Sequence, residues 1–233
     1  MPKAGTVALV GRPNAGKSTL LNRLLAEKLA IVSDKPQTTR HRIVGILSSE
    51  RGQIVFHDTP GVHRPLHHLN RQMVQSARDA MADADVVCLI VDASEAFGQG
   101  DKFLLEMVAA APGAKVAVLN KIDQIKKHHL LPKMQQYAAG ADFAAIVPIS
   151  ALDGDGCERL LEALWKLLPE GEPHYDPELL TIHPERFLAC ERIREKVLEA
   201  TRQELPFTTA LSGEWMKAVQ RRLHHWDSAN VLP

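Results

Sequence analysis

The sequence has few cysteines, no excess of either charge and no long apolar run. Its 233 residues include three cysteines, Cys88, Cys157 and Cys190, and no C-x-x-C pair. Such an odd, scattered set argues against a disulfide framework or a structural zinc site and favours a reducing compartment. Lysine plus arginine and aspartate plus glutamate each number 28. Net charge therefore gives no general reason to expect a nucleic acid or membrane partner, and any such site has to be a local patch.

Signals for membrane insertion and secretion are also missing from the sequence. No apolar stretch reaches the roughly 18–20 residues of a membrane-spanning helix. Met1–Val10 carries one lysine before a short apolar run that leads into a glycine loop, which is not the pattern of a signal peptide. The composition, 45% apolar and 24% charged residues, is ordinary for a soluble globular protein. The length suggests one full domain plus a small second one, at roughly 100–200 residues per domain.

Strand-like and helix-like segments alternate over residues 1–168, which predicts an α/β domain of three layers with a mainly parallel sheet between helices. We expect buried strands at Thr6–Val10, Val86–Val91, Val116–Leu119 and Ile146–Ile149. We expect helices at Lys17–Glu27, Asn70–Met81, Lys102–Ala110 and Cys157–Leu168. A short polar gap with a glycine separates two further strands, Ile43–Ser48 and Gln53–Phe56. This gap predicts a hairpin, so one edge of the sheet should be antiparallel.

Residues 169–182 are rich in proline, glycine and acidic residues, and we interpret them as a linker to a small α-rich segment, 183–233. We expect helices there at Arg186–Glu204 and Glu214–Trp226. The second of these has two interpretations. In the first, its basic side chains, which stand beside two tryptophans, contact RNA or anionic lipid. In the second, its apolar stripe packs on the preceding helix and the basic groups are solvated. We favour packing.

The pattern G-x-x-x-x-G-K-S lies between the first predicted strand and the first predicted helix, which is the context of a phosphate-binding loop. Backbone N–H groups of such a loop surround the phosphates, and glycine lets the chain approach them closely. Lys17 is expected at the β- and γ-phosphates, and the Ser18 hydroxyl on Mg²⁺. We expect the following residues to bind the nucleotide: Gly11, Arg12, Pro13, Asn14, Ala15, Gly16, Lys17, Ser18 and Thr19.

Two later segments predict the remaining metal and γ-phosphate contacts. D-x-x-G at Asp58–Gly61 follows a predicted strand, so the Asp58 carboxylate can hold Mg²⁺ through water and the Gly61 N–H can bond the γ-phosphate. A threonine in the loop before the second strand can join Ser18 on Mg²⁺, and we choose Thr39. The predicted metal residues are thus Ser18, Thr39 and Asp58, and the predicted catalytic residues are Lys17, Thr39 and Gly61.

The segment N-K-I-D at residues 120–123 predicts which base is bound. The Asp123 carboxylate only accepts hydrogen bonds, which suits the two adjacent donors of guanine and repels the matching acceptor of adenine. The Lys121 stem can cover the base, and Asn120 can tie this loop to the phosphate loop. Ser150 and Ala151, after the next strand, are expected to support the base through backbone N–H groups.

In combination and order, these stretches resemble the Era family of the translation-factor-related GTPases. The residues that carry the resemblance are GRPNAGKSTLLNRLL, KPQTTRHRIVGI, DTPGVH, NKID, PISAL and, in the C-terminal part, RFLACERIREKVLEATRQELP. The resemblance implies slow hydrolysis of GTP with Mg²⁺ by a P-loop GTPase domain, followed by a K-homology domain. It also implies binding to 16S rRNA in small ribosomal subunit assembly, and a cytoplasmic monomer with possible peripheral association with the inner membrane.

The catalytic centre lacks the glutamine that Ras-like GTPases use to orient the attacking water, since Val62 stands at that position. The resemblance suggests that Asn14 binds K⁺, which supplies positive charge instead. The alternative is that Asn14 only shapes the phosphate loop.

The C-terminal part departs from the family after Phe207. Residues 208–233 contain no G-x-x-G, the loop with which a K-homology domain clamps the nucleic-acid backbone, and no alternation that predicts strands. We therefore expect a partial K-homology remnant that is truncated, frame-shifted or diverged. A rival to the ribosome-assembly switch follows: a module that binds guanine nucleotide without coupling to RNA.

Overall fold

The structure is a computed structural model that describes residues 1–33, 38–39, 42–62 and 68–200. These residues belong to two compact units, Met1–Ile182 and a second that begins at His183. In the second unit the described element is one helix, α6 (Glu185–Ala200), close to the predicted Arg186–Glu204. The predicted helix Glu214–Trp226 lies outside the described residues. No helix within the described ranges is long and apolar enough to cross a membrane.

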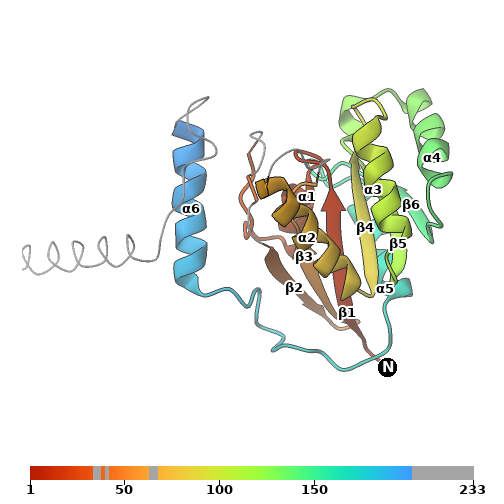
Figure 1. Ribbon diagram of the computed structural model, residues 1–233. Helices are drawn as coiled ribbons and strands as arrows, with labels where there is room; N and C mark the ends of the chain where they lie inside the picture. The colour runs from red at the N-terminus through yellow and green to blue at the C-terminus, as the bar shows by residue number, and fades with distance from the viewer. Residues whose placement is uncertain (34–37, 40–41, 63–67, 201–233) are drawn as a thin grey trace, which may run out of the picture. The chain divides into compact units, whose positions relative to one another are not determined.

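The first unit is built on one six-stranded sheet (Figure 1). Its strands are β1 (Lys3–Gly11), β2 (Ile43–Ser49), β3 (Gly52–Asp58), β4 (Val86–Asp92), β5 (Ala114–Asn120) and β6 (Ala145–Pro148). They lie in the order β2-β3-β1-β4-β5-β6. All neighbours are parallel except β2 and β3. The predicted α/β class and the antiparallel hairpin at one edge are therefore confirmed.

A helix follows each strand along the chain except β2, which is joined directly to β3. These helices are α1 (Lys17–Leu25), α2 (His68–Ala82), α3 (Gln99–Ala109), α4 (Leu130–Ala138) and α5 (Cys157–Leu167). Two short 3₁₀ helices, η1 (Ile122–Gln124) and η2 (Lys127–His129), precede α4. The helix α4 and both 3₁₀ turns are absent from the sequence-based prediction.

Helices cover both faces of the sheet. Ala8 and Val10 belong to a buried cluster with residues of α2 and α3, the helices in front of the sheet in Figure 1. On the other face α1 lies so close to β2 that a Cβ atom on Gly45 would come 2.7 Å from Leu25 Cδ1. The predicted three-layer arrangement is thus present.

The strand order shows where on the sheet the functional site lies, which is at the carboxyl ends of the strands. β1 has β3 on one side and β4 on the other, so the connections leave in opposite directions at its carboxyl end. In sheets of this kind a crevice for ligands opens at that point. The predicted site segments follow the carboxyl ends of β1, β3, β5 and β6 and therefore meet at this edge.

Residues 169–182, predicted to be a linker, contact the first unit along much of their length. Pro169 and Gly171 form backbone hydrogen bonds with the N-terminal residues. Farther along, the Ile46 N–H donates to Leu180 O at 2.8 Å, and the Thr181 hydroxyl donates to Val44 O at 2.5 Å. These contacts place the segment on the outer edge of β2. The predicted domain boundaries, 168 and 182, stay predictions.

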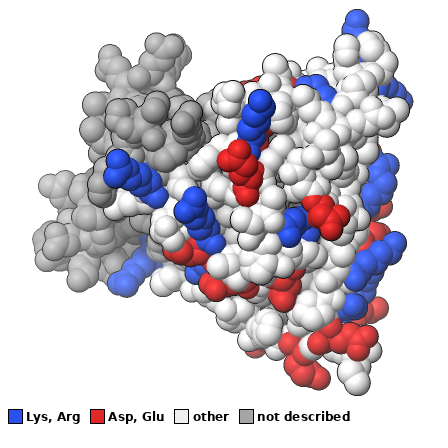
Figure 2. Space-filling view, turned by 45° about the vertical axis from the view of Figure 1, so that its right-hand side comes forward, with Lys and Arg blue, Asp and Glu red and all other residues white. Residues whose placement is uncertain are grey.

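The described charged side chains of both signs lie on the same face of the molecule in Figure 2. On the face that Figure 2 shows, basic and acidic groups of the described residues are interspersed. This distribution agrees with the balanced composition of the chain.

Candidate functional site

The phosphate loop is held in a conformation that depends on its glycine. Gly16, just before α1, has φ 93°, and Asn14 has φ 61°, so both lie in the left-handed region. A Cβ atom on Gly16 would lie 2.1 Å from the Asn120 side-chain nitrogen. Only glycine fits this place, where the phosphate loop meets the loop after β5.

Lys17 is 5% exposed and folds back along the loop. Its ammonium donates to Arg12 O at 2.9 Å and to Gly11 O at 3.2 Å. Burial lowers the pKa of Lys17 to about 8, against the opposing effect of the Asp58 charge. Among the described residues the hydrogen bonds of this ammonium go to carbonyl oxygens, so an anion in the pocket would stabilise the buried cation.

Three predicted metal residues meet beside Lys17. Ser18 Oγ donates to Asp58 Oδ2 at 2.6 Å and lies 3.0 Å from Thr39 Oγ1. Asp58 is fully buried, and its Oδ1 has no hydrogen-bond partner among the described residues. Burial raises the pKa of Asp58 to about 6, although Lys17 and the Ser18 hydrogen bond lower it. Hydroxyl and carboxylate oxygens are the ligands that Mg²⁺ prefers, so this cluster fits that ion.

The D-x-x-G segment lies directly on the phosphate loop. The Thr59 hydroxyl donates to Leu9 O at 2.8 Å, and the Val62 N–H donates to Gly11 O at 2.9 Å. A Cβ atom on Gly61 would lie 2.6 Å from Pro13 Cα. The Val62 side chain is fully buried in the cluster between the sheet, α2 and α3. It therefore points into the core, where it cannot orient a water molecule.

The loop after β5 is fastened to the phosphate loop by one amide. Asn120 donates from Nδ2 to Ala15 O at 2.9 Å and accepts the Ala151 N–H at Oδ1, also at 2.9 Å. Lys121 takes the left-handed conformation, φ 66°, and η1 begins after it. Asp123 is exposed at this turn.

The backbone N–H groups of Ser150 and Ala151, predicted to support the base, form hydrogen bonds within the protein instead. The Ser150 N–H donates to Asp155 O, and the Ala151 N–H donates to Asn120, so both groups have partners within the protein. Contact with a base would require these bonds to be shared. Support of the base by the two N–H groups stays a prediction.

A pocket at the carboxyl edge joins these segments. Its lining includes Pro13, Asn14, Gly16, Lys17, Ser18, Thr19, Ile31, Val32, Ser33, Thr38, Thr39, Gly61 and Lys121. The phosphate loop, the Thr39 segment, D-x-x-G and the loop after β5 thus face one space. Asp58 lies beneath this lining, at the hydroxyl of Ser18.

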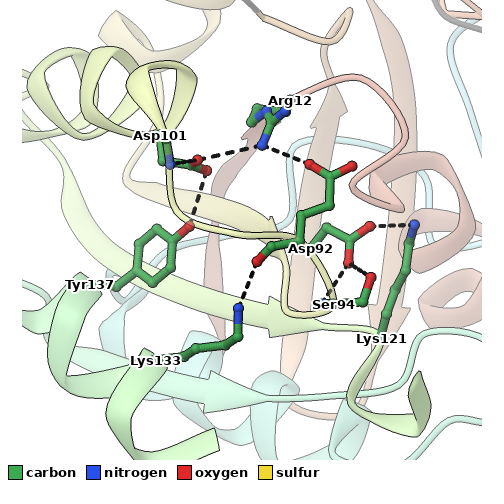
Figure 3. Close-up of polar contacts among 9 residues, drawn as sticks. Arg12, Asp92, Ser94, Asp101, Lys121, Lys133 and Tyr137 are labelled. Carbon is green, nitrogen blue, oxygen red and sulfur yellow. Dashed lines mark hydrogen bonds and ion pairs between the residues drawn. The ribbon is translucent and has the colours of Figure 1, made fainter. Parts of the chain in front are cut away.

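A polar network beside the pocket is missing from the sequence-based prediction (Figure 3). Arg12 pairs with Glu95 at 2.7 Å and with the buried Asp101 at 3.4 Å. Asp101 also accepts a hydrogen bond from the Tyr137 hydroxyl at 3.0 Å. Asp92 pairs with Lys121 at 2.6 Å. The available signal was the position of Asp92 at the carboxyl end of β4, the edge at which ligands bind in such sheets.

Comparison with known proteins gives consistent matches. The family model described as "50S ribosome-binding GTPase" matches residues 6–121. The chain is 45% identical over 222 residues to GTPase Era of Syntrophus aciditrophicus (strain SB), a match that covers 95% of this chain and 72% of that protein.

Two solved structures are similar over most of the chain. One is a variant of Era from Aquifex aeolicus bound to GDP and AlF4⁻, with 39% identity and a TM-score of 0.83. The other is Era in complex with MgGDPNP and nucleotides 1506–1542 of 16S ribosomal RNA, with 38% identity and a TM-score of 0.83. Each match covers 88% of this chain and 70% of the other chain.

Proposed function

The chain belongs to the Era family of GTPases, and from that premise we propose that it is a GTP-hydrolysing switch that acts in assembly of the small ribosomal subunit. One observation supports the nucleotide site above all others. Three oxygen-bearing side chains, Ser18, Thr39 and Asp58, converge beside the buried Lys17 ammonium at the mouth of a glycine loop. A site of this charge and shape suits a nucleoside triphosphate with its metal ion.

The chain's own residues supply binding and orientation. The loop N–H groups and Lys17 would take the phosphate oxygens, and the ammonium would exchange its carbonyl partners for them. Ser18, Thr39 and Asp58 would hold Mg²⁺, which supplies positive charge to the phosphate oxygens when bound. Asp123 would accept the two donors of guanine, while Lys121 covers the ring.

The switch would act through Thr39 and Gly61. Thr39 comes from the segment before β2, and Gly61 lies against Pro13 in the phosphate loop. Loss of the γ-phosphate would remove a partner from each segment, so both would be released on hydrolysis. Such a change gives the protein two states that a partner can distinguish.

The first test is release of phosphate from GTP, with Mg²⁺ and with EDTA in its place. We expect slow, Mg²⁺-dependent release, and Lys17→Ala should abolish it. No release by the wild-type chain would reject the enzymatic function. Adenosine triphosphate serves as the control nucleotide and should not be hydrolysed.

The second test concerns RNA, because the Era complex contains nucleotides 1506–1542 of 16S ribosomal RNA. We expect that RNA to bind the chain and to change the rate of phosphate release. A rate unaffected by the RNA would favour the rival function, a guanine nucleotide-binding module without RNA coupling. The predicted K-homology remnant, the monomeric state and the peripheral membrane association stay predictions.

A third test concerns K⁺ at Asn14, whose left-handed backbone places it at the rim of the pocket. If Asn14 holds K⁺, GTP turnover is faster in K⁺ than in Na⁺, and Asn14→Asp abolishes the difference. Equal rates of the wild-type chain in the two salts would leave Asn14 with the shaping role only.

A further inference from the structure

The loop between β4 and α3 contacts both ends of the proposed nucleotide site (Figure 3). It comprises residues 93–98 together with Asp92, the last residue of β4, and is called the β4–α3 loop below. Asp92 at its start pairs with Lys121 of the base-binding segment, and Glu95 pairs with Arg12 of the phosphate loop. The Ala93 N–H donates to Asn120 O at 2.8 Å, so the backbone joins the two loops as well.

The Asp92 carboxylate is fully engaged by its neighbours. Its Oδ2 lies 2.6 Å from the Lys121 ammonium, and its Oδ1 accepts the Ser94 N–H at 2.9 Å and the Ser94 hydroxyl at 2.5 Å. Burial acts to raise the pKa of Asp92, but the hydrogen bonds from Lys121 and Ser94 outweigh it and lower the pKa. The group is therefore a carboxylate at neutral pH.

The pair is sheltered from solvent. The Lys121 side chain is 28% exposed, and that of Asp92 is 11% exposed. By comparison, both partners of the ion pair between Arg51 and Glu162 on α5 are about half exposed. A sheltered ion pair holds a lysine side chain more firmly than an exposed pair does. Water screens the attraction between the two charges less, and the hydrogen bond between them is short.

The anchored ammonium has a consequence for the rest of the side chain. Lys121 lines the pocket, its backbone is fixed in the left-handed region, and its far end is fixed by Asp92. With both ends held, the apolar stem is set in place before a ligand arrives. A free lysine would have to lose its rotamer freedom when the ligand binds, which weakens binding.

We propose that Asp92 is a positioning residue for guanine nucleotide binding, which holds the Lys121 ammonium so that the lysine stem lies over the base. This inference rests on the proposed function, because it takes Lys121 to cover the guanine ring. It adds that the strength of nucleotide binding is set in part from the β4–α3 loop, outside the segments that contact the nucleotide.

The test is a double-mutant cycle on the full chain, with the Kd for GDP measured by calorimetry in the presence of Mg²⁺. Asp92→Asn keeps an oxygen for Ser94 but turns an amide toward the ammonium. We expect it to raise the Kd for GDP about tenfold, the size expected for one charge-assisted hydrogen bond. The KM for GTP should rise similarly, while kcat changes less than about twofold.

Lys121→Met keeps an apolar stem and removes the charge, so it separates the positioning role from a structural one. In that background Asp92→Asn should cause no further weakening. The inference is overturned if Asp92→Asn leaves the Kd unchanged, or if it weakens binding by the same factor in both backgrounds. If circular dichroism shows that the Asp92→Asn variant is not folded, Asp92→Glu takes its place in the same cycle.

Glu162→Gln is the matched control, since it makes the same chemical change in an ion pair remote from the pocket. It should leave the Kd for GDP unchanged, and an equal rise of the Kd in this variant would also overturn the inference. Absence of GDP binding by the wild-type chain would contradict the proposed function instead.

Discussion

At the scale of the residue, Gly61 lies tightly against the backbone of Pro13. A Cβ atom on Gly61 would lie 2.6 Å from Pro13 Cα and 2.7 Å from Pro13 N, and these backbone atoms cannot rotate away. The D-x-x-G segment and the phosphate loop would therefore have to separate if Gly61 carried a side chain. That movement would carry the Gly61 N–H away from the position proposed for the γ-phosphate.

We predict that Gly61→Ala lowers the single-turnover rate of GTP hydrolysis about tenfold or more, as expected for a loss of roughly 1.4 kcal/mol at the transition state. GDP affinity should change less, since GDP has no γ-phosphate. Gly171→Ala is the control, because its Cβ atom would meet nothing closer than 3.9 Å. A Gly61→Ala rate within twofold or so of the wild type would show that the two loops adjust freely.

A second residue-scale prediction concerns the choice of base. Asp123 is exposed beside the left-handed Lys121, so its carboxylate is free to meet a ligand. Asp123→Asn replaces one acceptor with a donor, which suits xanthine and not guanine. Competition between GTP and xanthosine triphosphate should therefore shift toward the latter, and an unchanged preference would remove Asp123 from base recognition.

The sequence predicts the segments that line the pocket, because each is a short motif whose chemistry can be interpreted by itself. Lys17, Ser18 and Asp58 follow from spacing and from their places after strands. The network around Asp92 and Tyr137 does not follow, because it joins side chains from β4, α3, α4 and two loops. Such contacts depend on tertiary packing, which no local pattern reveals.

At the scale of the element, the fold matches the prediction where hydrophobic patterns are strong. The continuous apolar run of β4 and the leucine-rich α5 are both present near the expected residues. The helix α4 is missing from the prediction because Pro132 lies within its short apolar pattern. Proline is tolerated there, since it stands in the first turn of the helix, where its missing N–H has no helical partner to lose.

The contact between β3 and residues 169–182 depends on one buried glutamine. Gln53 is fully buried, and its Oε1 accepts the His174 and Tyr175 N–H groups, each at 2.9 Å. Its Nε2 donates to Tyr175 O at 2.9 Å and to Ser48 Oγ at 3.0 Å. The side chain thus uses all four of its hydrogen-bonding positions, three of them to hold this segment on the sheet.

We predict that Gln53→Ala lowers the free energy of unfolding by about 2 kcal/mol, because several buried hydrogen bonds lose their partner. Urea unfolding followed by circular dichroism measures this change. Gln75→Ala on α2 is the matched control, since Gln75 is exposed and bonds to Asp79 on the same helix. Its effect should stay within about 0.5 kcal/mol. Equal effects of the two variants would mean that residues 174–175 contribute little.

At the scale of the whole molecule, residues 169–182 are either a linker that follows the GTPase domain or a part of that domain. Their composition predicts a linker, whereas their contacts make them the outer cover of β2. The Ile46 N–H and Val44 O both bond to this segment, and Ile46 and Val44 are buried. Without it, β2 would present unpaired backbone groups and apolar side chains at an open edge, which favours association between sheets.

The two alternatives predict different behaviour for shortened chains. We expect a chain that ends at Ile182 to fold and to bind GDP as tightly as the full chain, because the first compact unit ends there. A chain that ends at Leu168 should be less stable by about 3 kcal/mol, the sum expected for several lost hydrogen bonds, and should self-associate. Urea unfolding and sedimentation velocity measure the two effects.

If the chain that ends at Leu168 proves as stable and as monomeric as the one that ends at Ile182, then residues 169–182 are a linker that contributes nothing to the stability of the domain. If it is weakened as expected, residues 169–182 are the last element of the GTPase domain, and they protect the edge of β2, the strand that follows Thr39.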